Sequence, residues 1–83
     1  MEIKSDNDRL LLLCAFNYAL GRMTYVISAV AEEILNNWEL LKQSDKERIV
    51  KDIENAIEVG SAGMEMDVMQ WRRVLERYYG YNG

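Results

Sequence analysis

Hydrophobic residues recur at helical spacing along this chain, and they are most concentrated between Leu10 and Leu35. The stretch is interrupted once, at Gly21-Arg22, where a glycine can take the left-handed conformation that ends a helix. We therefore expect two core helices joined by a tight polar corner, the second beginning at a cap on Thr24. The other helices should pack onto this pair.

The first helix should begin at Ser5 or Asp6, because both side chains can accept hydrogen bonds from the free amides of a helix start. Apolar residues cover most of its circumference from position 10 to position 20, which predicts a central, enclosed helix. Asn17 is then either a buried residue whose hydrogen bonds fix the packing, which is the favoured alternative, or a surface residue. Cys14 is then a buried, inert thiol.

The second helix carries an apolar stripe at spacings of three and four residues that extends to about Leu41. A break at Asn36-Asn37 would divide it into two shorter helices. Ser44 and Glu47 stand three residues apart, as in a capping box, and predict the start of a third helix.

A loop over Gly60-Ser61-Ala62-Gly63 separates the third helix from a fourth, which Asp67 should cap and which buries Trp71. Residues 79–83 should form a frayed tail. The predicted fold class is all-α, a compact bundle of four helices, or five if the second helix breaks, in one domain spanning residues 1–83. Short connections predict that sequential neighbours are antiparallel.

Composition narrows the possible sites. The chain of 83 residues has one cysteine and no histidine, so it can form neither an intrachain disulfide nor the usual Cys/His zinc site. No apolar run is long enough to span a bilayer, and we expect a cytoplasmic protein without a cofactor. A core this small gains stability from added burial, which makes a homodimer through tyrosine and methionine side chains a second expectation.

The net charge of −4 is unevenly distributed, since ten of the fourteen acidic residues lie between positions 28 and 67. An acidic surface argues against direct nucleic-acid binding and suits a basic protein partner. Paired carboxylates could also act as acid and base or hold magnesium, but a bundle of this size offers little room for the cleft that such chemistry needs. We therefore expect no catalytic residues, and an acidic contact face formed by Glu32, Glu33, Asp52, Glu54 and Glu58.

The polar corner supplies the other candidates. Arg22 either binds a carboxylate or phosphate of a partner, or clamps the corner by capping helix carbonyls or pairing with an acid such as Asp52; the clamp is the favoured alternative. Tyr18 and Tyr25 are either interface anchors or half-buried rings that close the bundle end.

Three methionines lie near the loop that precedes the fourth helix. Flexible thioethers can adapt to an irregular partner or fill a gap under a loop, and both alternatives stay open here. The residues are Met64, Met66 and Met69.

The corner sequence Tyr18-Ala19-Leu20-Gly21-Arg22-Met23-Thr24-Tyr25-Val26 resembles a motif of small proteins from Gram-positive bacteria and their phages. The similarity continues in order through Asn37-Trp38, Arg48-Ile49, Asp52-Ile53 and Trp71. The resemblance implies a phage or mobile-element setting, in which small acidic proteins often antagonise host defences, anti-CRISPR proteins among them. It carries over no catalytic residue, and the matching corner positions can serve the fold.

The leading hypothesis is a non-catalytic interaction protein, encoded by a phage, that inhibits a bacterial defence complex by covering a basic nucleic-acid groove. The alternative is a small helical regulatory or nucleic-acid-binding protein that uses the arginines of the fourth helix. Those arginines are Arg72, Arg73 and Arg77.

Overall fold

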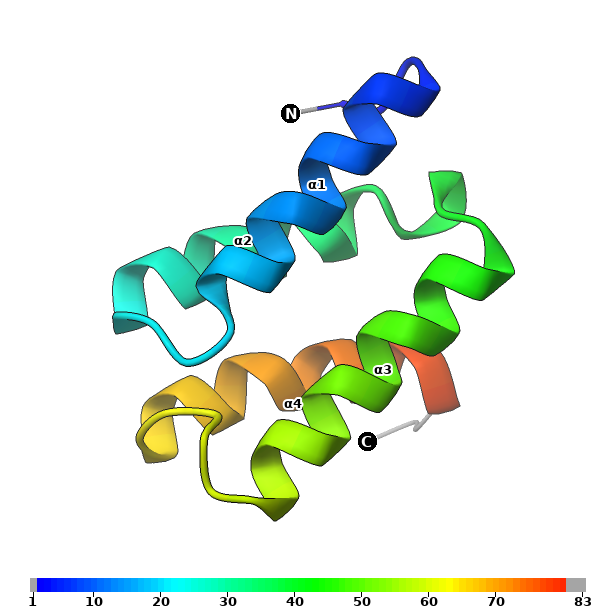
Figure 1. Ribbon diagram of the computed structural model, residues 1–83. Helices are drawn as coiled ribbons and strands as arrows, with labels where there is room; N and C mark the ends of the chain where they lie inside the picture. The colour runs from blue at the N-terminus through cyan, green and yellow to red at the C-terminus, as the bar shows by residue number, and fades with distance from the viewer. Residues whose placement is uncertain (1, 81–83) are drawn as a thin grey trace.

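Four α-helices and one turn of 3₁₀ helix make up residues 2–80, the part of the chain that the computed structural model describes (Figure 1). In order they are α1 (Asp6–Ala19), α2 (Thr24–Asn36), η1 (Trp38–Leu40), α3 (Gln43–Glu58) and α4 (Glu65–Tyr79). The predicted all-α bundle of four helices is confirmed. The second helix does break at Asn36-Asn37, but only the short η1 turn follows the break.

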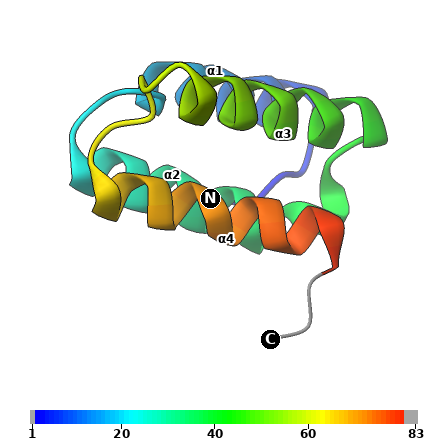
Figure 2. The same ribbon diagram turned by 90° about the horizontal axis from the view of Figure 1, so that it is seen from below.

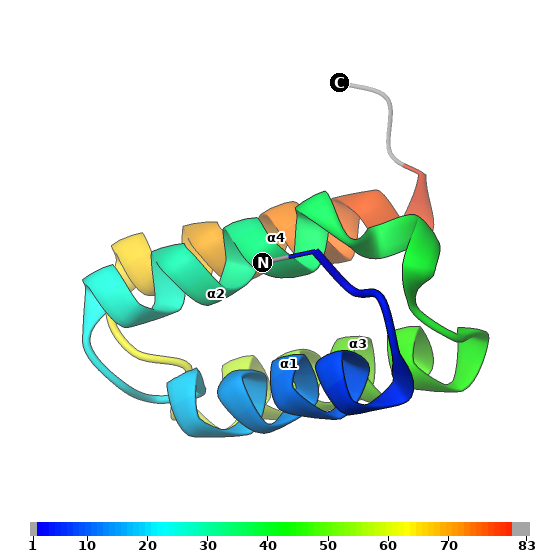
Figure 3. The same ribbon diagram turned by 90° about the horizontal axis from the view of Figure 1, so that it is seen from above.

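The helices form two layers, α1 beside α3 and α2 beside α4 (Figures 2 and 3). Helices α1 and α2 are antiparallel, as are α3 and α4, so the expectation for these sequential pairs is confirmed. The closest packing joins α2 to α4, which run parallel, whereas the consecutive helices α2 and α3 lie diagonally opposite. The α1–α2 and α3–α4 connections therefore meet at one end of the bundle.

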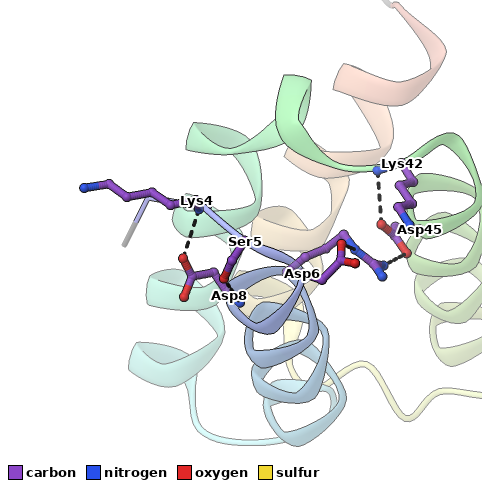
Figure 4. Close-up of polar contacts among 7 residues, drawn as sticks. Lys4, Ser5, Asp6, Asp8, Lys42 and Asp45 are labelled. Carbon is purple, nitrogen blue, oxygen red and sulfur yellow. Dashed lines mark hydrogen bonds and ion pairs between the residues drawn. The ribbon is translucent and has the colours of Figure 1, made fainter.

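Helix α1 begins as predicted, because the Ser5 hydroxyl oxygen accepts a hydrogen bond from the amide of Asp8 at 3.3 Å. The Asp8 carboxylate in turn accepts from the amide of Lys4 at 2.9 Å (Figure 4). Such reciprocal bonds satisfy amides that the helix itself leaves without partners. Two acids in the first turn also complement the positive end of the helix dipole.

Helix α3 begins earlier than the capping pattern predicted. The carboxylate of Asp45 accepts a hydrogen bond from the amide of Lys42 at 3.0 Å (Figure 4), so the cap comes from the third helical residue of a helix that starts at Gln43. The predicted box of Ser44 and Glu47 is wrong, because Ser44 already lies inside the helix.

Of the caps predicted for α2 and α4, one is wrong and one is confirmed. Thr24 is the first residue of α2 and does not cap it from outside, so that prediction is wrong. Asp67 caps α4 as predicted, since its carboxylate accepts from the amide of Met64 at 2.9 Å. Tyr79 belongs to α4 and Gly80 ends it in a left-handed conformation, while the rest of the predicted frayed tail, residues 81–83, lies outside the described residues.

Asn37 is the residue at which the second helix ends, and its side chain joins two segments. Its buried side chain donates to the carbonyl of Glu33 at 2.8 Å and accepts from the amide of Ile3 at 3.0 Å. The Glu33 carbonyl also accepts the helical bond from the Asn37 backbone amide at 3.1 Å, so the side chain adds a second bond at the C-terminus of α2. The bond from Ile3 ties the N-terminal segment across the bundle end. Trp38, buried in the η1 turn, continues the core beyond the break.

The core is centred on Phe16 of α1 and Trp71 of α4, whose rings meet edge to face with centroids 5.4 Å apart. Both side chains are almost completely buried. Because α1 and α4 are diagonal in the bundle, this pair crosses its centre and all four helices pack around it. The surrounding aliphatic core residues are Leu12, Ile27, Ile34, Ile49, Ile53 and Val74.

The prediction of an enclosed first helix is wrong. Leu10, Leu11 and Cys14 are exposed, and Asn17 is exposed as well rather than buried. Helix α1 packs closely on α2, but its approach to α3 in the same layer is much looser. Because α3 does not pack closely on α1, one side of α1 is left uncovered. The apolar pattern of the sequence does not show how many helices surround α1.

No helix within residues 2–80 combines the length and the apolar character that crossing a bilayer would require.

Candidate protein-interaction site

The two helical connections lie at the same end of the bundle, where α1 and α3 finish (Figure 2). Gly21 has a φ of +82°, and a methyl group added there would lie 3.1 Å from the carbonyl oxygen of Ser61. The α1–α2 corner therefore passes close to the α3–α4 loop. This contact brings together surface residues that are about forty positions apart in the sequence.

Exposed apolar side chains collect at this end. Of the eleven large apolar side chains that are exposed in residues 2–80, seven lie on the two connections or on the helical turns that adjoin them. We name these seven side chains, together with Arg22, the loop end. Its apolar members are Tyr18, Met23, Tyr25, Val59, Met64, Met66 and Met69. Several exposed large apolar side chains at one end of a domain are typical of a binding site.

The tyrosines are not half-buried rings that close the bundle. Tyr18 is 62% exposed and Tyr25 is 68% exposed, so that interpretation is wrong and both rings are available to a partner. Gap filling is wrong for the methionines too, since Met64 is 79% exposed and Met66 and Met69 are similarly open. These side chains contribute little to the core of the protein. Exposing their apolar surface to water is unfavourable in free energy, and covering them with another surface removes that cost.

Arg22 acts as a clamp, in one of the two ways predicted. Its Nε donates to the carbonyl oxygen of Tyr18 at 3.1 Å, and its guanidinium lies 4.7 Å from the centre of the Tyr18 ring. It does not pair with Asp52, which instead faces Arg48 at 3.8 Å. The clamp orients a guanidinium at the edge of a surface pocket of about 480 Å³ lined by Tyr18, Gly21, Arg22, Met23, Tyr25 and Val26.

The fold does not gather the predicted acidic residues on one face. Glu32 and Glu33 lie on α2, whereas Asp52, Glu54 and Glu58 lie on α3, diagonally across the bundle. Some of the carboxylates are also engaged: Glu32 pairs with Arg73 at 3.0 Å, and Glu54 accepts from the hydroxyl of Tyr79 at 2.8 Å. Glu58 is exposed at the end of α3, close to the loop end.

Two of the three arginines of α4 are paired with acids of α2 and of the η1 turn. Arg73 meets Glu32, and Arg77 meets Glu39 of the η1 turn while lying 5.9 Å from the centre of the Trp38 ring. Pairing of this kind removes much of the positive field that a phosphate backbone would need. The arginines thus join α2 and η1 to α4.

One largely buried ion pair was not predicted from the sequence. Arg9 of α1 donates to the carboxylate of Asp45 at 2.7 Å, and the two side chains are only 15% and 8% exposed. The spacing of Lys42 and Asp45 could have indicated the cap of α3, but nothing in the sequence pairs Arg9 with a residue thirty-six positions away. Among residues 2–80 no three metal-binding side chains lie close enough to hold an ion.

The loop end therefore offers aromatic, thioether and guanidinium groups whose chemistry suits binding to another surface. Comparisons with protein-family models, with curated proteins and with solved structures found no match to this chain.

Proposed function

We propose that this protein is a non-enzymatic protein-binding domain that contacts its partner through the loop end. The observation that carries the proposal is the concentration of seven exposed large apolar side chains at one end of the bundle. Elsewhere on α3 and α4 the outward positions are mainly charged or polar, as expected for surfaces that remain in water.

The chemistry of the loop end suits a protein surface better than a small molecule. Tyrosine and arginine are, with tryptophan, enriched among the residues that dominate binding energy at protein interfaces. A tyrosine ring buries a large area at a low cost in conformational entropy. Methionine adapts its shape to irregular partners. The clamped Arg22 can add a charge-assisted hydrogen bond to a carboxylate on the partner.

The setting that we propose is inhibition of a bacterial defence complex, with the protein acting like an anti-CRISPR protein by occupying a surface. The resemblance of the corner motif supports that setting, and the net charge of −4 would attract a basic nucleic-acid-binding complex. The separated acidic residues act in this proposal as a diffuse attraction, and the loop end makes the close contact.

Partner capture and a nuclease assay test the proposal together. The tagged protein is used to isolate its partner from a lysate of a Gram-positive bacterium with an active defence nuclease, and the isolated nuclease is then assayed with the protein added. We expect Tyr25→Ala combined with Met66→Ala to weaken inhibition by at least about tenfold, since losing two anchors costs about 1.4 kcal/mol or more.

A matched control neutralises acids without touching the loop end. Asp52→Asn combined with Glu54→Gln should leave inhibition at high salt unchanged and reduce it modestly at low salt, because diffuse charge acts mainly on the association rate. Equal inhibition by the Tyr25/Met66 variant and the wild type would exclude the loop end as the contact. Loss of inhibition with the Asp52/Glu54 variant alone would show that the acidic residues make the contact with the partner.

A further inference from the structure

The outward side of α1 lacks the charged residues that the other helices present to water. The chain contains no aspartate, glutamate, lysine or arginine from Leu10 to Gly21. By contrast, α3 places Glu47, Lys51 and Glu54 outward. The side of a helix that no partner covers normally carries charged or polar residues.

The uncharged residues form one stripe along α1. Leu10 and Leu11, then Cys14, then Asn17 and Tyr18 are separated by three or four residues at each step, which places them on the same side of a helix, and all five are exposed. We name this set the α1 stripe. Its spacing is that of a helix that packs lengthwise against another helix.

A pocket runs beside the stripe, in the loosely packed space between α1 and α3. It has a volume of about 160 Å³ and is lined by Leu10, Leu13, Cys14, Phe16, Asn17, Arg48 and Ile49. A cavity of about 150 Å³ accepts a benzene-sized group. One aromatic or aliphatic side chain from a covering helix can therefore enter it.

We propose that a second copy of this chain covers the α1 stripe, with the two α1 helices antiparallel and the two-fold axis beside Cys14. Cys14 is the midpoint of the stripe, since the leucines precede it by three and four residues and Asn17 and Tyr18 follow it by three and four. An antiparallel pair centred there sets Leu10 of each copy against Tyr18 of the other. Because Leu10 lines the pocket, the Tyr18 ring is then the side chain placed to enter it.

The charges at the two ends of α1 select this orientation. Asp6 and Asp8 lie in the first turn, and Arg22 follows the last turn. Antiparallel pairing brings Arg22 of one copy toward the acids of the other and opposes the two helix dipoles, whereas parallel pairing sets acids against acids. A contact with one surface shared by both copies is the usual form of a homodimer.

The dimer should be weak. Helix α1 has fourteen residues, which corresponds to a length of about 21 Å, so the contact is smaller than a standard stable interface. A dissociation constant on the order of 100 μM is consistent with that size. The inference does not depend on the proposed function, because Tyr18 and Arg22 are the two residues shared with the loop end and the dimer uses none of its other side chains.

Sedimentation velocity under reducing conditions tests the dimer. The wild type should change from monomer to dimer as its concentration rises toward about 1 mM, and Leu11→Lys should weaken association by at least about tenfold because each interface would bury two extra charges. Ala29→Lys, on the exposed side of α2, adds the same charge away from the stripe and should dimerise like the wild type. A wild type that stays monomeric throughout, or a Leu11→Lys variant that associates like the wild type, would overturn the proposal.

Oxidative cross-linking tests the position of the axis. The wild type should form a disulfide-linked dimer at least about tenfold faster than the variant Cys14→Ser/Ala29→Cys, which carries its single thiol at an exposed position of α2, because a disulfide needs Cβ atoms about 4 Å apart. Equal rates for the two proteins would overturn the antiparallel pairing centred on Cys14.

Discussion

The carboxylate of Asp45 serves two elements at once. One oxygen accepts from the Lys42 amide at the start of α3, and the other receives the guanidinium of Arg9 from α1. Because the pair is largely buried, removing Asp45 leaves the Arg9 guanidinium mostly shielded from water, with the more exposed Asp6, 3.6 Å from its Nε, as its remaining acidic partner. Single residues thus decide how the first and third helices are held where their backbones do not pack closely.

Replacing Asp45 should therefore be costly. We expect Asp45→Ala to lower the free energy of unfolding by about 3 kcal/mol, since both the ion pair and the cap are lost. Asp45→Asn, which keeps an acceptor for the Lys42 amide, should cost about half as much. Urea unfolding followed by tryptophan fluorescence measures both changes.

Asp52→Ala is the matched control, because its ion pair with Arg48 is exposed and spans one helical turn. Its effect should stay below about 0.5 kcal/mol. Similar losses for Asp45→Ala and Asp52→Ala would show that the Arg9–Asp45 pair does not hold the helices together. Sequence reasoning could not find this pair, since charge patterning identifies neighbours along a helix and says nothing about partners on different helices.

At the scale of the elements, the helix ends follow from local chemistry and were predictable in part, since the caps predicted at Thr24 and Ser44 were wrong. Ser5, Gly21 and Asp67 act where the sequence indicated, because a cap or a left-handed glycine depends on residues within one turn. The environment of α1 was not predictable in this way. Its apolar side chains suited a central position, but only the loose spacing from α3 shows that one side is open.

The corner between α1 and α2 gives a prediction at this scale. Gly21 and Gly60 both have positive φ, but an added methyl group meets the Ser61 carbonyl at Gly21 and nothing within 4 Å at Gly60. Gly60→Ala should cost about 1 kcal/mol for the left-handed backbone alone. Gly21→Ala should cost about 2–3 kcal/mol, because crowding at the meeting of the two connections adds to the backbone term.

Thermal unfolding of the two glycine variants separates the contributions. The difference between them measures how tightly the α1–α2 corner packs on the α3–α4 loop, and hence how well the two halves of the loop end are held together. If Gly21→Ala were no less stable than Gly60→Ala, the two connections would not be in close contact, and the loop end would be two separate surfaces.

The whole molecule combines a small buried core with two groups of exposed apolar side chains. Phe16 and Trp71 join diagonal helices through the core, while the α1 stripe and the loop end leave large apolar side chains in water. Selection for stability alone does not favour such exposure, since each of these side chains stays largely in contact with water in the isolated domain. Both surfaces therefore indicate binding, and because they share only Tyr18 they can serve different contacts.

A comparison of two substitutions on α1 distinguishes a helix with one open side from an enclosed helix. Phe16→Ala should lower the melting temperature by roughly 15–30 °C, because truncating a buried phenylalanine costs about 3–5 kcal/mol and a domain of this size loses about 4–8 °C per kcal/mol. Leu11→Ala, five residues earlier on the same helix, removes a side chain that is 58% exposed and should shift the melting temperature by less than about 4 °C. Both should be measured at about 5 μM, where a weak dimer is dissociated. Comparable losses at the two positions would mean that α1 is enclosed, as its apolar pattern alone suggests, and would leave no open stripe for a second copy to cover.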